Sequence, residues 1–360
     1  MLKKQSMRIA RQVKQNVLKF RTGDVLFVGI DVHKRKYHVA LWKNGAPASH
    51  WVMPANNEAV VKRLQPVRRG IQRIVYEAGP TGYGLARTLE AAGFPVGVAA
   101  PGKTPAPANE GNKSDRIDCR KLAEFAAKGL LTFVAAPTPA EEHERQVLRL
   151  RESMIDKRRR VKQQIRSFFL QHELQEPKGM NYWAARAVAT LNALELPADL
   201  RFCLDELLQE LEHSTDALKR FDRKLAVIGA RHEKRMQLLR THPGVGEKTA
   251  MQFLLEVYRC ERFADRQGLA SYLGLAPRVR QSGATRREGG VVPAGRGRLR
   301  AHLVQACWQW IRRDAVGKKL YGRLCRNTGC AQKAILALAR RMAVDLWAMA
   351  RDGRPYCAAT

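Results

Sequence analysis

The chain has 360 residues, of which 45% are hydrophobic, so it is long enough to fold as two or more globular domains. It contains no run of about 18 apolar residues that could span a membrane, and its basic N-terminus lacks the apolar core of a signal peptide. Lys and Arg number 65 against 33 Asp and Glu, and a net charge of +32 spread over the chain indicates nucleic acid as partner; an anionic membrane surface is the alternative, disfavoured because no basic amphipathic helix dominates.

Residues 1–24 form a basic arm, in which no acid precedes Asp24. A disordered extension and an arm that becomes ordered on RNA or DNA both agree with this composition. The sequence leaves the two interpretations open.

Residues 25–135 have the pattern of an α/β domain, in which apolar runs predict strands and periodic segments next to Gly or Pro predict helices. Strands are expected at 26–31, 36–43, 48–53, 73–77 and 95–100, and helices at 56–66, 83–92 and from 114 or 115 to near 129. The first two strands read as a hairpin, and 101–113 as a loop. This order is that of a ribonuclease-H-like (RuvC-like) fold, although unrelated α/β domains share parts of it.

Residues 136–240 are almost wholly helical in pattern, with apolar residues at helical spacing in 141–174 and again after Pro197. Two long helices joined by residues 175–198 predict an antiparallel hairpin, which we interpret as a coiled-coil linker. Bases crowd the first helix while acids thin out, which favours nucleic-acid contact over a merely solvated face. The residues expected to make this contact are Arg151, Arg158, Arg159 and Lys162.

Residues 241–345 predict a second, mostly helical domain, followed by a tail at 346–360. Its helices are expected from near Glu247, at 298–313 and at 331–350. The segment Pro243-Gly244-Val245-Gly246 resembles half of a helix-hairpin-helix, whose backbone N–H groups could hold a phosphate together with Lys248. A plain loop before a helix is the alternative.

The cysteines bear on the location of the protein. Seven cysteines without paired spacing favour reduced thiols. Cys325 and Cys330 are close in sequence, but no matching Cys/His pair accompanies them, so a zinc site is not expected. We therefore expect a cytoplasmic protein that associates with the nucleoid.

Four carboxylates have positions that suit phosphodiester chemistry. Asp31 ends the first strand and Glu77 ends a later one, and strands of one sheet can bring both to the same edge. Asp115 and Asp118 are three apart at a helix start and share a face. Mg²⁺ prefers such oxygen ligands, and paired ions clamp the attacking and leaving oxygens of a phosphodiester. Each acid alone has an ordinary role in a turn, an ion pair or a helix cap, but the combination, beside the expected nucleic-acid contact Lys113, predicts a metal site.

Ser282 lies next to a glycine in a segment that we expect to be a loop. Such a serine could attack a phosphorus atom while arginines steady the phosphate and the developing charge. No His-based triad is evident, so activation would depend on metal ions; because Ser-Gly is common in turns, spacing alone leaves the role of Ser282 open. The arginines expected to contact nucleic acid here are Arg278, Arg280, Arg296 and Arg298.

Taken together, these residues resemble the bridge-RNA-guided DEDD transposases of the IS110 family of insertion sequences. The resemblance covers most of the chain, and the order and spacing of its motifs are more specific than any single motif. In the N-terminal half the motifs are Gly29-Ile30-Asp31-Val32-His33-Lys34, Tyr76-Glu77-Ala78-Gly79 and Lys113-Ser114-Asp115-Arg116-Ile117-Asp118. In the C-terminal half they are Pro243-Gly244-Val245-Gly246, Arg262-Phe263-Ala264, Tyr272-Leu273-Gly274-Leu275-Ala276-Pro277, Gln281-Ser282-Gly283 and Leu299-Arg300.

The resemblance implies a RuvC-like domain whose Asp31, Glu77, Asp115 and Asp118 bind two Mg²⁺ ions, and a C-terminal transposase domain with Ser282 as nucleophile. It implies dimers, supported by the coiled coil, that assemble as a tetramer in which carboxylates of one subunit meet the serine of another. A noncoding bridge RNA would pair with donor and target DNA. Ser282 would form a transient phosphoserine link before strand exchange through a Holliday-type junction.

Two other functions remain open at this point. A RuvC-type junction nuclease would use the same carboxylates with water as the nucleophile, and it would not need Ser282. A non-catalytic RNA- or DNA-binding protein would need none of the four acids, and their joint presence argues against it.

Overall fold

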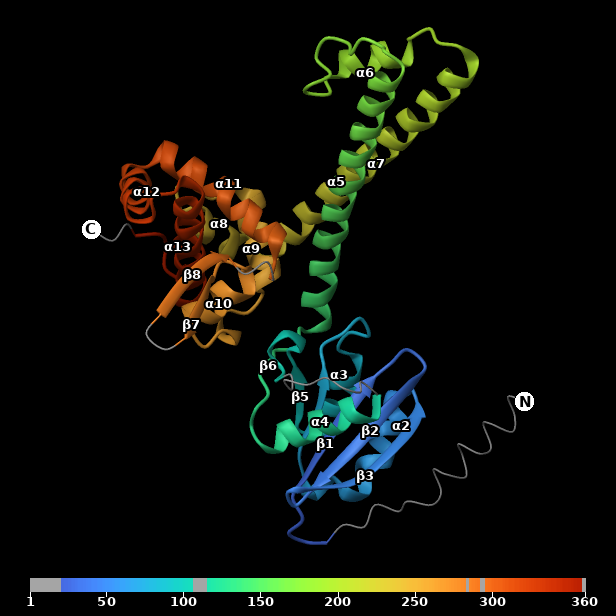
Figure 1. Cartoon of the computed structure of the whole chain (residues 1–360), viewed down its shortest axis with the longest axis vertical. Helices are drawn as coiled ribbons and strands as arrows, with labels where there is room; N and C mark the ends of the chain where they lie inside the picture. Colours follow the sequence, from blue (N-terminus) through green and yellow to red (C-terminus); the bar gives the residue numbers. More distant parts are fainter. Residues whose placement is uncertain (1–20, 106–114, 283–284, 292–294, 358–360) are drawn as a thin grey trace. The chain divides into compact units, whose positions relative to one another are not determined.

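The computed structural model describes residues 21–105, 115–282, 285–291 and 295–357, with side chains except at 115–116 and 278–291 (Figure 1). The predicted arm before residue 21, most of the predicted 101–113 loop and Lys113 lie outside the described residues. The chain divides into two compact units, Met1–Pro137 and Thr138–Thr360. Across the described ranges, no helix combines the length and apolar character that crossing a membrane requires.

The first unit is built on a six-stranded mixed sheet with the strand order β3-β2-β1-β4-β5-β6. Strands β1 to β3 form an antiparallel meander, whereas β1, β4 and β5 run parallel and β6 is antiparallel to β5. The strands are β1 Leu26–Val32, β2 Lys36–Lys43, β3 Ala46–Pro54, β4 Ile71–Glu77, β5 Val96–Ala99 and β6 Phe133–Val134. Strand β1 therefore lies inside the sheet, with β2 on one side and β4 on the other.

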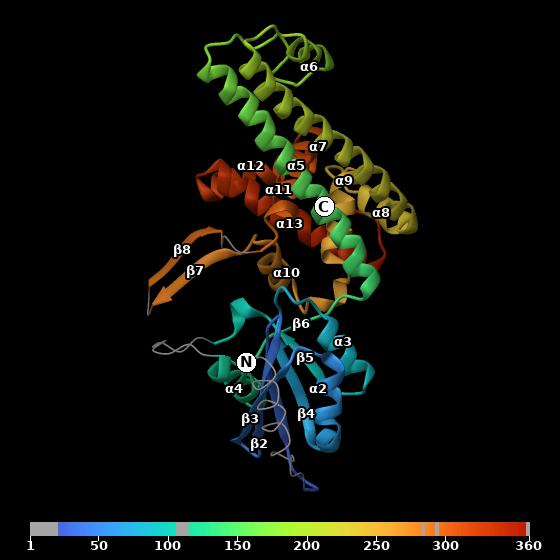
Figure 2. The ribbon, with the colours of Figure 1, turned by 90° about the vertical axis from the view of Figure 1, so that its right-hand side faces the viewer.

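Helices cover both faces of this sheet (Figure 2). Helices α2 (Asn57–Leu64) and α3 (Gly84–Ala91) share one core cluster with Tyr76 of β4. Helix α4 (Asp115–Ala127) shares a separate cluster with Val75 of the same strand. Successive side chains of a strand point to opposite faces, so neighbouring residues of β4 are buried in different layers.

The second unit begins with a long helical hairpin, here called the stem, which consists of α5 (Pro139–Gln171) and α7 (Ala198–Arg231) (Figure 1). Thr138 and Glu141 form a capping box that satisfies N–H groups at the start of α5. Apolar residues at helical spacing form the core of the stem: Val161, Ile165, Phe168, Phe169, Leu204, Leu208 and Leu211. The predicted pair of long helices is confirmed, and the segment between them contains a short helix, α6 (Ala185–Asn192).

Helices and a β-hairpin complete the second unit. The helices are α8 Glu233–Arg240, α9 Glu247–Val257, α10 Arg266–Leu273, α11 Gly297–Arg313, α12 Ala315–Thr328 and α13 Ala331–Asp352. They enclose a core that includes the fully buried Trp310 and Met342. Strands β7 (Pro277–Ser282) and β8 (Thr285–Val291) pair antiparallel.

The elements differ from the prediction where apolar periodicity is short or hidden. The hairpin of β7 and β8 replaces the loop expected around Ser282, because its Arg, Gln and Thr residues give no apolar alternation. Strand β6 has only 2 residues, too few to show a period. Helix α13 reaches Asp352 and buries Leu346 and Trp347, so part of the predicted 346–360 tail belongs to the core. The mixed α/β architecture with many helices is confirmed, whereas its ribonuclease-H-like identity stays a prediction.

Candidate active site

Asp31 and Glu77 lie at the same edge of the sheet. Strands β1 and β4 are parallel neighbours, and Ile30 stands opposite Tyr76 in their register. The next residues, Asp31 and Glu77, therefore stand at the same level near the ends of the two strands. Ile30 and Tyr76 are buried in the cluster of α2 and α3. By alternation, Asp31 and Glu77 face the other side of the sheet, where α4 packs.

Helix α4 lies directly on β1 because Gly29 has no side chain. A Cβ at this position would collide with the carbonyl oxygen of Cys119 and lie 2.6 Å from the backbone nitrogen of Ala123. This close approach packs the middle of α4, just beyond Asp118, against β1. Burial raises the pKa of the Cys119 thiol to about 12, and the nearby carboxylates of Asp31 and Asp118 contribute to the rise. Asp31 and Asp118 therefore approach the same thiol from different elements.

Among the side chains that the structure describes, none of these three carboxylates pairs with a Lys or Arg. Oδ2 of Asp31 lies 3.0 Å from Nε2 of His33, and its side chain is 23% exposed. Glu77 is exposed and Asp118 is half-buried, and neither forms an ion pair with a described Lys or Arg. Carboxylates that stay apart from bases keep their negative charge available to another cation.

The donor chemistry of this edge fits a divalent ion, because carboxylate oxygens are the hard ligands that Mg²⁺ prefers. Asp115 is the first residue of α4, but its side chain is outside the described part. Among the side chains that are described, no group of three or more His, Cys, Asp or Glu is arranged to hold an ion. The structure thus brings Asp31, Glu77 and Asp118 to one edge, and the metal site of four acids stays a prediction.

Ser282 is the last residue of β7 and stands opposite Thr285 in the hairpin. Its backbone is therefore fixed by strand pairing, which corrects the expectation of a loop. Arg278 and Arg280 precede it on the same strand, and side chains are not described in this segment. Ser282 belongs to the second unit and the carboxylates belong to the first. Their joint action in one active site stays a prediction.

Several bases predicted to contact nucleic acid have partners within the second unit. The side chain of Arg151 is only 12% exposed and pairs with Asp222 of α7. Arg298 of α11 pairs with Asp156 of α5. Arg296 lies beside a buried carboxylate of α9, at 3.3 Å. These contacts give the three arginines a role in joining helices, whether or not they also touch nucleic acid.

Other predicted bases are on the surface. The side chain of Arg159 is 67% exposed, although one of its guanidinium nitrogens lies 3.3 Å from Asp156. Lys248 is exposed in the first turn of α9. The ammonium group of Lys162 lies 4.9 Å from the centre of the Trp183 ring, and burial and neighbouring arginine charges lower its pKa. Arg158, Lys162 and Trp183 line a cavity among α5, α6 and α7. Asp205, Glu212 and Asp216 line the same cavity, so it combines basic, acidic and aromatic groups.

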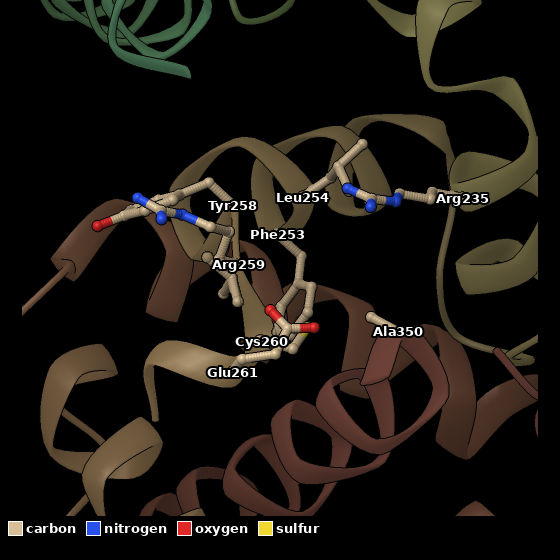
Figure 3. A pocket seen from close by; sticks show the side chains of 9 residues that line it. Arg235, Phe253, Leu254, Tyr258, Arg259, Cys260, Glu261 and Ala350 are labelled. Carbon is tan, nitrogen blue, oxygen red and sulfur yellow. The ribbon is translucent and has the colours of Figure 1, made fainter. Parts of the chain in front are cut away.

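Another cavity lies among α8, α9 and α13 (Figure 3). Its lining includes the apolar side chains of Phe253 and Leu254, with Arg235 and Arg259 beside them. Burial raises the pKa of the Cys260 thiol in this lining to about 11, so the thiol stays protonated at neutral pH. The cavity contains no predicted site residue and offers no activated nucleophile.

Gly29 of β1, His33 beyond the end of β1 and Cys119 of α4 lie close to these carboxylates, although the sequence analysis did not single them out as site residues. A glycine inside an otherwise buried strand is a signal for close backbone approach, and the position of Gly29 fits that signal. Nothing in the pattern around Cys119 distinguishes it from a core residue.

Comparison with known proteins gives matches to both units. One family model, a transposase of the DEDD type of the IS110 group, matches residues 28–173, and the model for the transposase IS116/IS110/IS902 family matches residues 236–322. A putative transposase, y4qE, of Sinorhizobium fredii is 29% identical over 360 residues, covering 91% of this chain and 89% of the relative. The transposase for insertion sequence element IS1111A of Coxiella burnetii is 24% identical over 275 residues, 75% of each chain. The pilin gene-inverting protein of Moraxella bovis is 28% identical over 151 residues, 41% of this chain and 47% of the relative.

Proposed function

We propose that this chain, which belongs to the IS110/IS116 family of DEDD transposases, moves an insertion sequence with the carboxylates of its first unit and Ser282 of its second. The proposal is supported by the positions of Asp31, Glu77 and Asp118 at one edge of the sheet, where none of them pairs with a described Lys or Arg. Asp115, at the start of the same helix as Asp118, completes the proposed set.

The four acids would hold two Mg²⁺ ions, which when bound supply charge stabilisation for the phosphate under attack. In the proposed cleavage, the hydroxyl oxygen of Ser282 forms a bond to phosphorus, and the bond from phosphorus to one deoxyribose oxygen breaks. The released strand end takes up the serine proton. In rejoining, the hydroxyl oxygen of a strand end forms a bond to phosphorus, and the bond from phosphorus to the Ser282 oxygen breaks. Ser282 takes up the proton that the strand-end hydroxyl loses.

The proposed partners follow from charge and from the resemblance. A chain with net charge +32 suits two DNA duplexes, donor and target, together with a noncoding bridge RNA that selects them. Arg159, Lys162 and Lys248 are the described bases that best suit these contacts. We also propose assembly from dimer to tetramer, and a cytoplasmic location beside the nucleoid that agrees with the free cysteines.

Two variants separate this proposal from its alternatives. Ser282→Ala and Asp118→Asn are assayed for cutting of DNA that carries the element ends, in the presence of Mg²⁺. We expect both variants to bind nucleic acid and to lose cleavage. Cleavage that survives in Ser282→Ala indicates a nuclease that uses water, and unchanged activity in Asp118→Asn indicates a role without metal catalysis.

The guide RNA needs its own test. The chain is expressed beside its native flanking DNA and purified, and the RNA that accompanies it is sequenced. One discrete RNA from the flank supports guided recombination and identifies the target to test. A random mixture of RNA contradicts the guide and favours loose binding of polyanions.

A further inference from the structure

A buried carboxylate connects the stem to the segment that carries Ser282. Glu256 lies near the end of α9 and is only 3% exposed. Arg149 of α5 donates two hydrogen bonds to it, from Nε at 2.8 Å and from Nη2 at 2.9 Å. Burial alone would raise the pKa of Glu256, but the hydrogen bonds and charge of Arg149, together with Arg296, hold it below its usual value. The carboxylate is therefore charged, and its charge is directed at neighbouring helices.

The other side of Glu256 faces the base of the hairpin of β7 and β8. Nε of Arg296 lies 3.3 Å from Oε2 of Glu256 and donates a hydrogen bond of 3.2 Å to the hydroxyl of Tyr272. That hydroxyl in turn donates to the carbonyl oxygen of Glu256, at 3.1 Å. Tyr272 precedes β7 and Arg296 follows β8. One carboxylate thus contacts both chain segments from which the hairpin emerges.

The two segments are also joined to each other. The backbone N–H of Arg296 donates to the carbonyl oxygen of Tyr272, at 3.1 Å, and Arg300 donates to the carbonyl oxygen of Gly274, at 2.9 Å. Gly295 has a φ of 96°, and a Cβ there would lie 2.5 Å from the backbone nitrogen of Gly274. The base of the hairpin is therefore closely packed and can transmit a displacement.

Arg262 fixes the corner between α9 and this base. Its guanidinium lies 4.2 Å from the centres of both the Tyr258 and the Tyr272 rings. Its Nε donates to the carbonyl oxygen of Val257, at 3.0 Å, and its Nη2 to that of Glu256, at 3.2 Å. This contact set accounts for two motifs of the resemblance, the one that begins at Arg262 and the one that begins at Tyr272, which the proposed chemistry does not use.

We propose that Glu256 is a positioning residue that fixes the base of the Ser282 hairpin to helix α5, so that the orientation of the stem sets the position of the serine. The proposal rests on the proposed role of Ser282 as nucleophile. A second link points the same way, because Arg298, two residues beyond Arg296, pairs with Asp156 of α5. Each link joins the same helix to the segment that follows β8.

The test uses the full chain with two variants and a matched control. Glu256→Gln keeps the shape of the side chain and removes its charge, and Tyr272→Phe removes one hydroxyl from the same cluster. Glu144→Gln is the control, because Glu144 of α5 is also a mostly buried carboxylate, contacted by Arg231 at 3.3 Å and His232 at 2.8 Å. It joins α5 to the end of α7 and has no described contact with the hairpin.

The first readout is hydrogen exchange of backbone amides. We expect amides of residues 272–300 to exchange about tenfold faster in Glu256→Gln and to a smaller degree in Tyr272→Phe, because local opening becomes easier. Glu144→Gln should leave this segment as in the wild type. Unchanged exchange in both Glu256→Gln and Tyr272→Phe, or equal loosening in Glu144→Gln, overturns the proposal.

The second readout is formation of a covalent link between Ser282 and DNA. We expect its rate to fall about tenfold or more in Glu256→Gln at unchanged DNA affinity, because small displacements of a reacting group cost rate rather than binding. A fall in affinity with an unchanged rate overturns the positioning role. If Ser282→Ala still cleaves DNA while Glu256→Gln loosens the hairpin, the proposed chemistry of Ser282 is wrong. The role of Glu256 in fixing the base of the hairpin to α5 is then still supported.

Discussion

Acidic side chains have different surroundings at two places in the molecule, the sheet edge of the first unit and the helices of the second. In the second unit, Glu256 is bound by Arg149 and Arg296, and Glu144 has a similar pair of basic neighbours. At the sheet edge of the first unit, Asp31 and the carboxylates near it have no described Lys or Arg partner. Because the chain has 65 bases and 33 acids, an acid is expected to form an ion pair with a base. A set of acids that stays apart from bases is therefore the stronger indication of a cation site.

The largest effect is expected from Asp31→Asn, which removes a charge from the sheet edge with little change in shape. Loss of a metal ligand should lower the rate of DNA cleavage by about a thousandfold or more, while nucleic-acid affinity changes less than about twofold. Asp24→Asn is the matched control, because Asp24 pairs with Lys43 at 2.7 Å, before β1 begins, and it should cleave like the wild type. Cleavage by Asp31→Asn at the wild-type rate would contradict the proposal that Asp31 is a metal ligand.

The next prediction concerns a buried basic side chain, His242 of the second unit, and its effect on stability. His242 packs against Trp310 and Tyr356, and burial lowers its pKa from 6.5 to about 4. Protonation of His242 then favours the unfolded chain, in which its pKa is higher. The contribution of neutral His242 to the free energy of unfolding is therefore complete above the unfolded pKa, and it is lost as the pH falls from 6.5 towards 4. The free energy of unfolding should fall by at most about 3 kcal/mol over this range of pH.

Urea denaturation at several pH values, compared between the wild type and His242→Phe, measures this contribution. The variant should lack the part of the pH dependence that lies in this window, because phenylalanine does not titrate. The same slope of unfolding free energy against pH in both proteins would show that His242 does not control it.

A smaller effect is expected from Gly29→Ala, which leaves every acid in place. The added methyl group would force α4 away from β1, which should lower the free energy of unfolding by about 1–3 kcal/mol. Cleavage should fall as well, because Asp118 moves with α4. Gly102→Ala is the control, because a Cβ there meets nothing within 4 Å; its stability should stay within about 0.5 kcal/mol of the wild type. Equal effects of the two changes would contradict the role of Gly29.

The smallest effects distinguish two arginines of the same helix. Arg159→Ala should weaken nucleic-acid binding slightly and reduce the dependence of log affinity on log salt by about one, because Arg159 is exposed. Arg151→Ala should leave that dependence unchanged and lower the free energy of unfolding by about 1 kcal/mol, since Arg151 pairs with Asp222. Titrations at several salt concentrations and thermal unfolding separate the two; an altered salt dependence only in Arg151→Ala would reverse the assignment.

Much of the local structure was predictable because its signal is local. The apolar run that precedes Asp31 predicts β1, and the helical spacing of apolar residues predicts α5 and α7. The meeting of Asp31 with Glu77 could be expected only as an edge of some sheet, since the register of parallel strands depends on distant segments.

Other features have no local signal. Glu256 reads as an ordinary acid of an amphipathic helix, and its burial depends on Arg149, 107 residues earlier in the chain. Strand β7, which ends at Ser282, shows no apolar alternation, so its pattern predicts a loop. The role of Ser282 as nucleophile is implied by the family resemblance alone and stays a prediction, because the spacing of its residues is common in turns.

The most direct test of the account is to trap the covalent intermediate. Labelled DNA that carries the element ends is cut in the presence of Mg²⁺ and the proposed guide RNA, the protein is digested, and the labelled peptide is sequenced by mass spectrometry. We expect a single labelled peptide that contains Ser282 in the wild type and none in Asp31→Asn. Cleaved DNA without any labelled peptide, or a label on another residue, would contradict it.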